Sequence, residues 1–302
     1  MLTDGRPCLK LADGQMWEFL STKDTDGLIE RIASLMELKH CLPGDSKKII
    51  YLLGDLTEKV SPGLDMGYCP ELRHLPKDGW LVTPMKYANI WHHAKTPHIL
   101  CEVDKKKGKI LDIRRILQSL YPLYQNVISS GGMTSHSAML EYGGMGVLIS
   151  ATSGTGKSTC CRHIAEPWRA VCDDETLIIP SEKGYRVHPF PTWNDYITRR
   201  SKKTWDVQRH LPLSAIFFLQ QSPTDQVIPV GKGMAAYSLY RSSLQIFHRY
   251  KPYLSDDELN AANKTLFDNA CAISNAVPSF VLHASLRGRF WDEMEKVIPV
   301  DN

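Results

Sequence analysis

A glycine-rich stretch in the middle of the chain carries the residue types that bind phosphate. Residues 151–159 read Ala-Thr-Ser-Gly-Thr-Gly-Lys-Ser-Thr, which fits the spacing of Ala or Gly, any four residues, Gly, Lys, and then Ser or Thr. The glycines let the backbone curl so that several N–H groups point at phosphate oxygens, while the lysine reaches the β- and γ-phosphates and the serine hydroxyl reaches Mg²⁺. The stretch predicts a nucleotide phosphate site made by Ser153, Gly154, Thr155, Gly156, Lys157, Ser158 and Thr159.

The segments on either side of this loop indicate how it is held. Residues 147–150, Val-Leu-Ile-Ser, read as a strand, and residues 157–165 read as a short helix whose N-terminal end favours anions. Further upstream, residues 136–142 read as another strand and the Gly-Gly-Met-Gly of 143–146 as a tight turn. We therefore expect a β-hairpin to lead into the loop, whereas the common phosphate-loop folds reach it through a βα crossover.

Phosphoryl transfer also needs carboxylates, one to orient Mg²⁺ and one to accept the proton of the attacking hydroxyl. Asp173 and Asp174 follow the apolar stretch 168–172, and we expect them at the carboxyl edge of the sheet beside the loop. His136 and Glu141 are an odd number of residues apart on their strand, so they point to opposite faces and at most one can face the nucleotide. We expect that residue to be His136.

The composition is that of a water-soluble globular protein. The chain has 302 residues, of which 43% are hydrophobic and 23% charged, and no apolar run approaches the ~20 residues of a membrane span. Its net charge of +3 is too small to indicate nucleic acid as the main partner. The N-terminus lacks a signal-peptide pattern and the eight cysteines form no C-x-x-C pair, so we expect a cytoplasmic protein with reduced thiols. Homo-oligomer formation is left open.

The chain divides into two parts of α/β character. Residues 1–130 read as a mixed α/β N-terminal domain, to which we assign recognition of the phosphoryl acceptor because it offers no catalytic residues. We expect a helix over 26–36, strands over 48–54, from residue 80 and over 97–103, and a helix over 110–129. Residues 131–302 form the second domain, with later strands over 175–179, 213–219 and 278–283 and a last helix over 287–297.

The order of elements in the second domain resembles the HPr kinase/phosphorylase family. The resemblance covers residues 131–297: a strand bearing His136, a Tyr-Gly turn, a Gly-Val-Leu-Ile strand, the phosphate loop, and an apolar strand ending in Asp173-Asp174. Ser-Thr-Cys-Cys-Arg at 158–162 and Cys-Asp-Asp-Glu at 172–175 are most similar to the HPr-kinase-like proteins of the SynChlorMet natural-product cassette.

The resemblance implies a fold and a set of roles. The fold is an HPr-kinase-like P-loop core, in which a β-hairpin feeds the phosphate loop and helices flank a mixed sheet. Lys157 contacts the transferred phosphoryl group of ATP, and Ser158 helps to hold Mg²⁺, to which we also assign Asp174. Asp173 accepts the proton of the acceptor hydroxyl, and His136 is the active-site histidine.

One family signature is missing. The Glu-x-Arg-Gly-Leu-Gly motif, which supplies a second metal contact and is tied to phosphorolysis, is replaced by Val187-His-Pro-Phe-Pro-Thr-Trp-Asn-Asp195. The missing motif argues against a reverse phosphorylase reaction without deciding whether one exists, and Asp195 is the remaining candidate for the second metal carboxylate.

Together these features predict an ATP-dependent kinase that phosphorylates a Ser or Thr hydroxyl of a small protein or precursor peptide. Two alternatives stay open: a kinase for a small-molecule hydroxyl, and a nucleotide-gated module that binds a peptide without transferring phosphate. The aspartate pair favours transfer, because a binding module needs the phosphate loop but no free carboxylate aimed at a hydroxyl.

Overall fold

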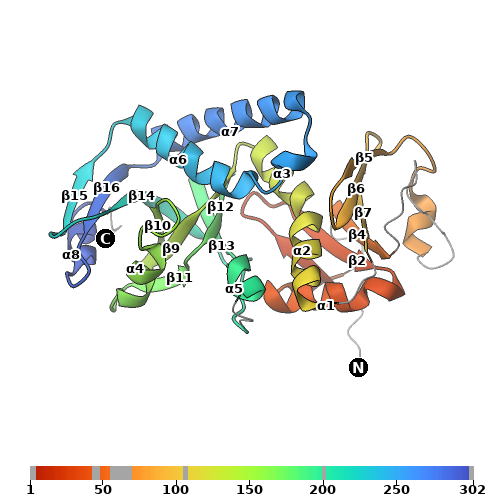
Figure 1. Cartoon of the computed structure of the whole chain (residues 1–302), viewed down its shortest axis with the longest axis horizontal. Helices are drawn as coiled ribbons and strands as arrows, with labels where there is room; N and C mark the ends of the chain where they lie inside the picture. Colours follow the sequence, from red (N-terminus) through yellow and green to blue (C-terminus); the bar gives the residue numbers. More distant parts are fainter. Residues whose placement is uncertain (1–4, 43–47, 55–69, 105–107, 199–201, 299–302) are drawn as a thin grey trace. The chain divides into compact units, whose positions relative to one another are not determined.

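The computed structural model describes residues 5–42, 48–54, 70–104, 108–198 and 202–298. The chain forms two compact units, coloured along the sequence in Figure 1. The first unit contains residues 1–123 together with 193–208, and the second contains residues 124–192 and 209–302. The sequence placed a single boundary at residue 130, whereas the contacts divide the chain after Leu123 and return one later segment to the first unit. The overall class is α/β, with two mixed sheets and flanking helices.

The first unit is built on a seven-stranded mixed sheet with the strand order β3-β1-β2-β4-β7-β6-β5. Its strands β2, β4 and β7 run parallel, and the others pair antiparallel. The predicted helix at 26–36 and the predicted strands at 48–54 and 97–103 are confirmed. The strands are β1 (Arg6–Lys10), β2 (Met16–Ser21), β3 (Lys39–Cys41), β4 (Lys48–Gly54), β5 (Leu81–Pro84), β6 (Ala88–His93) and β7 (Thr96–Val103). The helices are α1 (Asp26–Leu35), α2 (Lys109–Ser119), α5 (Trp193–Thr198) and the short 3₁₀ helices η1 (Lys23–Thr25) and η2 (Pro70–His74).

The prediction of a single helix over 110–129 is wrong in one respect, because the structure has two helices in this range. The structure has α2 up to Ser119 and a separate helix α3 (Tyr121–Ser129). Pro122 explains the break, since proline has no backbone N–H and its ring clashes with the carbonyl four residues earlier in a continuous helix. Proline is tolerated in a first helical turn, which is its position in α3.

The second unit has a nine-stranded mixed sheet with the order β11-β9-β10-β14-β13-β12-β8, and with β16 pairing with both β14 and β15. The predicted hairpin is present: β9 and β10 are joined by Gly143 and Gly144, whose φ values of 55° and 78° suit a two-residue turn that only glycine adopts readily. The strands are β8 (Met133–Ser135), β9 (Ser137–Tyr142), β10 (Met145–Ser150), β11 (Arg169–Cys172), β12 (Glu175–Ser181), β13 (Gly184–Phe190), β14 (Leu211–Gln221), β15 (Gln226–Pro229) and β16 (Ser279–Ala284). The helices are α4 (Lys157–His163), α6 (Lys232–Phe247), η3 (Lys251–Tyr253), α7 (Asp256–Ala276) and α8 (Phe290–Glu295).

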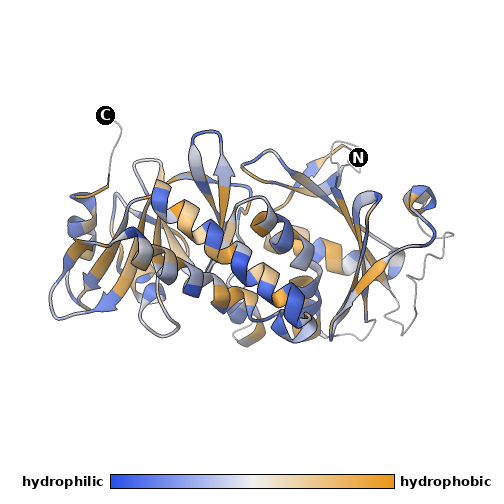
Figure 2. Cartoon of the chain, turned by 90° about the horizontal axis from the view of Figure 1, so that it is seen from above, coloured by the Kyte–Doolittle hydropathy of each residue, from blue (hydrophilic) through white to orange (hydrophobic). Residues whose placement is uncertain are grey.

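Two long helices, α6 and α7, pack on each other and were not predicted. Ser255 begins α7 with a capping box, because its hydroxyl accepts the amide of Glu258 while the Glu258 carboxylate accepts the amide of Ser255. Both helices alternate apolar and polar residues, which Figure 2 shows as mixed orange and blue along their length. Several inward positions carry small or polar residues such as Ser242 and Asn269, so the apolar periodicity is too weak to identify the helices from sequence.

The strand directions bring several loops to one edge of this sheet. β10 runs parallel to β14, and β14 runs parallel to β16. β11 runs the same way as β10, because each is antiparallel to β9. The ends of β10, β11, β14 and β16 therefore lie on the same edge, together with the start of β9. This is the edge at which open α/β sheets bind ligands.

Candidate functional site

The glycine-rich loop joins the end of β10 to α4. Gly154 has φ +80° and Gly156 has φ +117°, which are values that residues with a Cβ rarely adopt. The loop is tied internally by a 2.8 Å hydrogen bond between the hydroxyls of Thr152 and Thr155. It is tied to β14 by Gln221, whose side-chain amide donates to the Thr155 carbonyl at 3.1 Å. The curled backbone expected from the two glycines is present.

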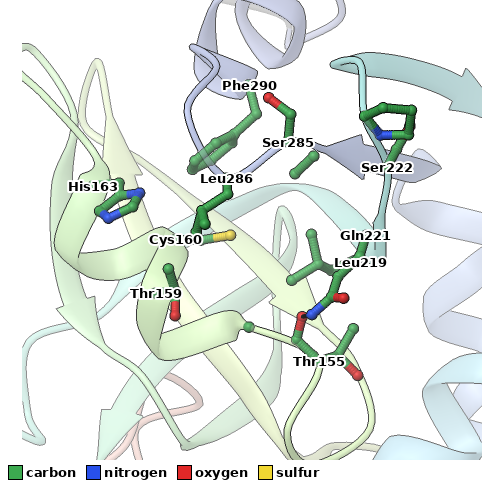
Figure 3. Close-up of a pocket in the computed structure, with 13 residues that line it drawn as sticks. Thr155, Thr159, Cys160, His163, Leu219, Gln221, Ser222, Ser285, Leu286 and Phe290 are labelled. Atoms are coloured by element: carbon green, nitrogen blue, oxygen red, sulfur yellow. Dashed lines mark hydrogen bonds between the residues drawn. The ribbon is translucent and has the colours of Figure 1, made fainter.

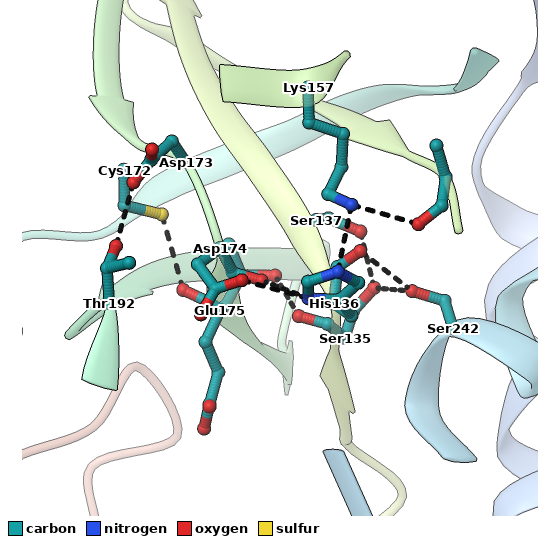
Figure 4. Close-up of polar contacts among 12 residues, drawn as sticks. Ser135, His136, Ser137, Lys157, Cys172, Asp173, Asp174, Glu175, Thr192 and Ser242 are labelled. Carbon is teal, nitrogen blue, oxygen red and sulfur yellow. Dashed lines mark hydrogen bonds and ion pairs between the residues drawn. The ribbon is translucent and has the colours of Figure 1, made fainter. Parts of the chain in front are cut away.

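Lys157 is the first residue of α4, and its side chain turns back under the loop. It is only 6% exposed. Its Nζ donates to the carbonyl oxygen of Ala151 and to Nε2 of His136, each at 2.9 Å (Figure 4). Burial lowers the pKa of the Lys157 ammonium, and the carboxylates of Asp174 and Asp173 oppose that shift.

His136 connects Lys157 to the aspartate pair. Its Nδ1 lies 3.1 Å from Oδ1 of Asp174 and 3.0 Å from the Asp174 carbonyl oxygen. An ammonium group can only donate, so Nε2 of His136 must be the acceptor facing Lys157, and the ring proton sits on Nδ1 where it is donated to Asp174. The result is a chain of polar contacts from Asp174 through His136 to Lys157.

The backbone of His136 is anchored to helix α6. Its carbonyl oxygen accepts the hydroxyl of Ser242 at 3.2 Å, and its amide donates to the carbonyl oxygen of Ser242 at 3.4 Å. Ser242 also bonds to the hydroxyl of Ser135, which in turn bonds to that of Ser137. These buried serines fix the start of β9, and with it the position of the imidazole.

Asp173 is held from a different direction. Thr192, which follows β13 and is buried, donates its hydroxyl to Oδ1 of Asp173 at 2.7 Å. The hydrogen bond engages one carboxylate oxygen and orients the other. Thr192 could not be predicted from the sequence, because it lies in a segment with no motif and is brought to Asp173 only by the pairing of β12 with β13.

One cavity of about 230 Å³ unites these groups. Thr155 lines a neighbouring cavity instead. All the other predicted site residues line this one: His136, Ser153, Gly154, Gly156, Lys157, Ser158, Thr159, Asp173 and Asp174.

Two other acidic residues considered from sequence lie elsewhere. Glu141, at the far end of β9, accepts guanidinium hydrogen bonds from Arg169 at 3.0 Å and from Arg209 at 2.6 Å. It does not line the cavity, in keeping with its expected orientation opposite to His136. Asp195 lies on α5, which belongs to the first unit, and is also absent from the residues lining the cavity.

A buried charged cluster directly beneath the aspartate pair was also missed. Glu175 is fully buried, accepts the phenol of Tyr124 and pairs with the Arg249 guanidinium at 2.9 Å. Burial raises the pKa of the Glu175 carboxyl, and Arg249 and Tyr124 act against that rise. The cluster anchors the chain immediately after Asp174 to α3 and to the turn after α6. The only signal in the sequence was a third acidic residue following Asp173-Asp174.

The donor atoms in the cavity are hard oxygen ligands. Within the part of the chain that the structure describes, no three His, Cys, Asp or Glu side chains converge closely enough to hold a metal by themselves. Mg²⁺ rarely uses an all-protein cage and is bound by one or two carboxylates together with substrate phosphates. The hydroxyl of Ser158 and the carboxylates of Asp173 and Asp174 fit that requirement.

Residues 99–299 match the family model described as SynChlorMet cassette protein ScmC. The chain belongs to this family. The match spans most of the chain and includes every residue of the cavity. It supports the predicted association with the SynChlorMet cassette, but it does not extend to the HPr kinase family. No curated protein matches the chain.

None of the helices that the structure describes combines the length and the apolar character needed to cross a membrane.

Proposed function

We propose that the chain is an ATP-dependent kinase with an HPr-kinase-like P-loop core in its second unit. The observation that carries the proposal is the shared cavity, where a glycine-rich loop and its lysine face two carboxylates and a histidine. A site for binding phosphate alone would need the loop and the cation. The additional carboxylates would repel a nucleotide unless a metal ion or a chemical step used them.

The phosphate-binding half of the proposal rests on Lys157 and the loop. The Lys157 ammonium is buried at the base of the loop and already faces two acceptors, His136 and the Ala151 carbonyl. Phosphate oxygens would replace these weaker acceptors, and the low-dielectric surroundings would strengthen the interaction. Ser158 and Asp174 would hold Mg²⁺, which when bound neutralises phosphate charge.

The transfer half rests on Asp173. The oxygen of the acceptor hydroxyl would form a bond to the γ-phosphorus of ATP, and the bond from that phosphorus to the β–γ bridging oxygen would break to release ADP. The hydroxyl proton would pass to the Asp173 carboxylate. Thr192 would keep the carboxylate oriented for this step, because its hydrogen bond at 2.7 Å fixes one of the two oxygens.

The acceptor we propose is a Ser or Thr hydroxyl on a small protein or precursor peptide, recognised in part by the first unit. The resemblance to HPr kinase/phosphorylase proteins supports this choice, and no feature of the cavity favours nucleic acid or a lipid surface. We place the reaction in the cytoplasm, where ATP and Mg²⁺ are available.

The test compares Asp173→Asn with Asp174→Asn. Asp173→Asn keeps the shape of the side chain but removes the basic oxygen, so transfer from γ-³²P-ATP to acceptors in a lysate of the native cells should fall ~10²–10⁴-fold. ATP affinity should stay within a few-fold of wild type. Asp174→Asn should instead raise the Mg²⁺ concentration needed for half-maximal binding of ATP.

Asp268→Asn is the matched control, because Asp268 is an exposed carboxylate on α7 paired with Lys264. It should change neither quantity. Transfer by Asp173→Asn at the wild-type rate would show that Asp173 is not the base. If the wild-type protein transfers phosphate to nothing while ATP changes its affinity for a peptide, the nucleotide-gated module is the correct function.

A further inference from the structure

A second cavity, of about 450 Å³, opens beside the phosphate loop. It lies at the same sheet edge, between α4, the end of β14 and the segment that follows β16. Figure 3 shows Thr159 and Cys160 from α4, Leu219 from β14, and Leu286 and Phe290 from beyond β16 around this space. The two cavities meet at Gly156 and Thr159, which line both.

The walls of this second cavity combine apolar and polar groups and carry little charge. The polar side chains are those of Thr155, Thr159, His163, Gln221, Ser222 and Ser285. Leu219, Cys160 and Phe290 are buried residues of the core that present atoms to it. Burial raises the pKa of the Cys160 thiol to about 11, so the sulfur is uncharged at neutral pH. Neither aspartate nor glutamate is among the residues that line this cavity in the described part of the chain.

Leu286 has an unusual position at the mouth of the cavity. Its side chain is 70% exposed, the highest value among the exposed large hydrophobic residues of the described chain. A leucine exposed to water at the mouth of a cavity leaves apolar surface that the flat face of a ligand would cover. The volume of about 450 Å³ lies within the ~300–1,000 Å³ range typical of small-molecule sites.

The segment that carries Leu286 is held in place. The amide of Ser285 donates to Oδ1 of Asp225 at 2.6 Å, which ties the end of β16 to the loop after β14. At Gly288 a Cβ would lie 1.8 Å from Oδ2 of Asp225, so only glycine permits this approach. Gln221 joins the same wall to the phosphate loop through Thr155. The cavity is therefore preformed next to the phosphate site.

We propose that this cavity binds the base and ribose of the nucleotide whose phosphates occupy the first cavity. The inference rests on the proposed function. A cavity with both apolar and hydrogen-bonding walls that continues from a phosphate site suits a planar base and a ribose joined to a phosphate chain.

The test measures dissociation constants of ATP and inorganic tripolyphosphate, each with Mg²⁺, by isothermal titration. Ala284→Phe places a ring in the cavity from the end of β16, and Leu286→Ala removes the apolar side chain at its mouth. Ala284→Phe should weaken ATP binding by at least tenfold, and Leu286→Ala should weaken it about fivefold. Both variants should bind tripolyphosphate as the wild type does, and the wild type should bind ATP more tightly than tripolyphosphate.

Leu81→Ala is the matched control, because Leu81 is another exposed leucine, on β5 of the first unit. It should leave both dissociation constants unchanged. If Ala284→Phe fails to fold, Leu286→Ala decides, since it alters only an exposed side chain. ATP binding no tighter than tripolyphosphate binding, or unchanged in both variants, would overturn the base site while leaving the phosphate site intact. Failure of both ATP and tripolyphosphate to bind would overturn the proposed function itself.

Discussion

Replacing Lys157 by alanine should separate ligand binding from folding. The ammonium is 6% exposed and is the cation at the base of the loop that contacts both Ala151 and His136. At about 4 Å and an effective dielectric constant of about 20, one unit charge on a phosphate interacts with it by about 4 kcal/mol. The loop amides and Mg²⁺ would remain and compensate part of this energy. We therefore expect ATP affinity to fall by about 10²–10³-fold, which is less than or equal to the loss that about 4 kcal/mol would cause.

The effect of Lys157→Ala on stability should be much smaller. Two hydrogen bonds are lost, each contributing about 1 kcal/mol, but a buried charge whose pKa is lowered by burial is removed at the same time. The open cavity also admits water to the two acceptors that lose their donor. The free energy of unfolding should therefore change by no more than about 1 kcal/mol.

The assay is isothermal titration with a non-hydrolysable ATP analogue and Mg²⁺, paired with urea unfolding. Lys183→Ala is the matched control, because Lys183 is an exposed cation in the turn between β12 and β13. The substitution removes the same charge as Lys157→Ala, but far from the cavity. It should bind the analogue as the wild type does. Unchanged affinity of Lys157→Ala together with unchanged turnover would refute the phosphate-loop assignment. A loss of several kcal/mol in unfolding free energy would show that the lysine serves folding instead.

Two further predictions concern the groups around the cavity. Arg249→Met should lower the free energy of unfolding by about 3 kcal/mol, because it leaves Glu175 buried without its cation; we take the lower end of the usual range because the Arg249 side chain is 27% exposed. Burial raises the pKa of the Glu175 carboxyl, so the carboxylate takes up a proton as the pH falls towards the ordinary glutamate range. The loss of unfolding free energy should therefore be largest at neutral pH and should shrink at lower pH. A loss that is independent of pH in urea unfolding would contradict the argument. Gly156→Ala should cost about 1–3 kcal/mol of backbone strain at φ +117° and weaken ATP binding, whereas Gly184→Ala, at φ +95° in a distant turn, should cost similar stability and leave ATP binding unchanged. Equal effects of the two glycine variants on ATP affinity would show that the curl at Gly156 is not needed for the site.

The sequence was most informative about features that depend only on residues close together in the chain. The β9–β10 hairpin follows from two apolar runs separated by Gly143-Gly144, and the loop follows from the spacing of Gly154, Gly156 and Lys157. Local turn chemistry sets these elements, so a short window of residues contains all the information. Residues that precede or end the same strands, such as His136 and Asp173, could be placed for the same reason: strand direction fixes the edge at which they emerge.

The partners of those residues could not be predicted, because they come from distant segments brought together by packing. Thr192 meets Asp173 only after β12 and β13 pair, and Arg249 meets Glu175 only after α6 covers the sheet. No periodic pattern marks a single threonine or arginine in these segments.

The division between sequence and tertiary structure is clearest at the sheet edge. The sequence alone determined the curled loop and predicted its phosphate-binding role, since both depend on backbone freedom at two glycines and on one lysine. Only the tertiary structure decided what lies next to it. The second cavity takes its walls from α4, β14 and the segment after β16, and these share no local pattern. They meet because β10, β14 and β16 run parallel, which places the ends of three strands far apart in sequence on one edge of the sheet.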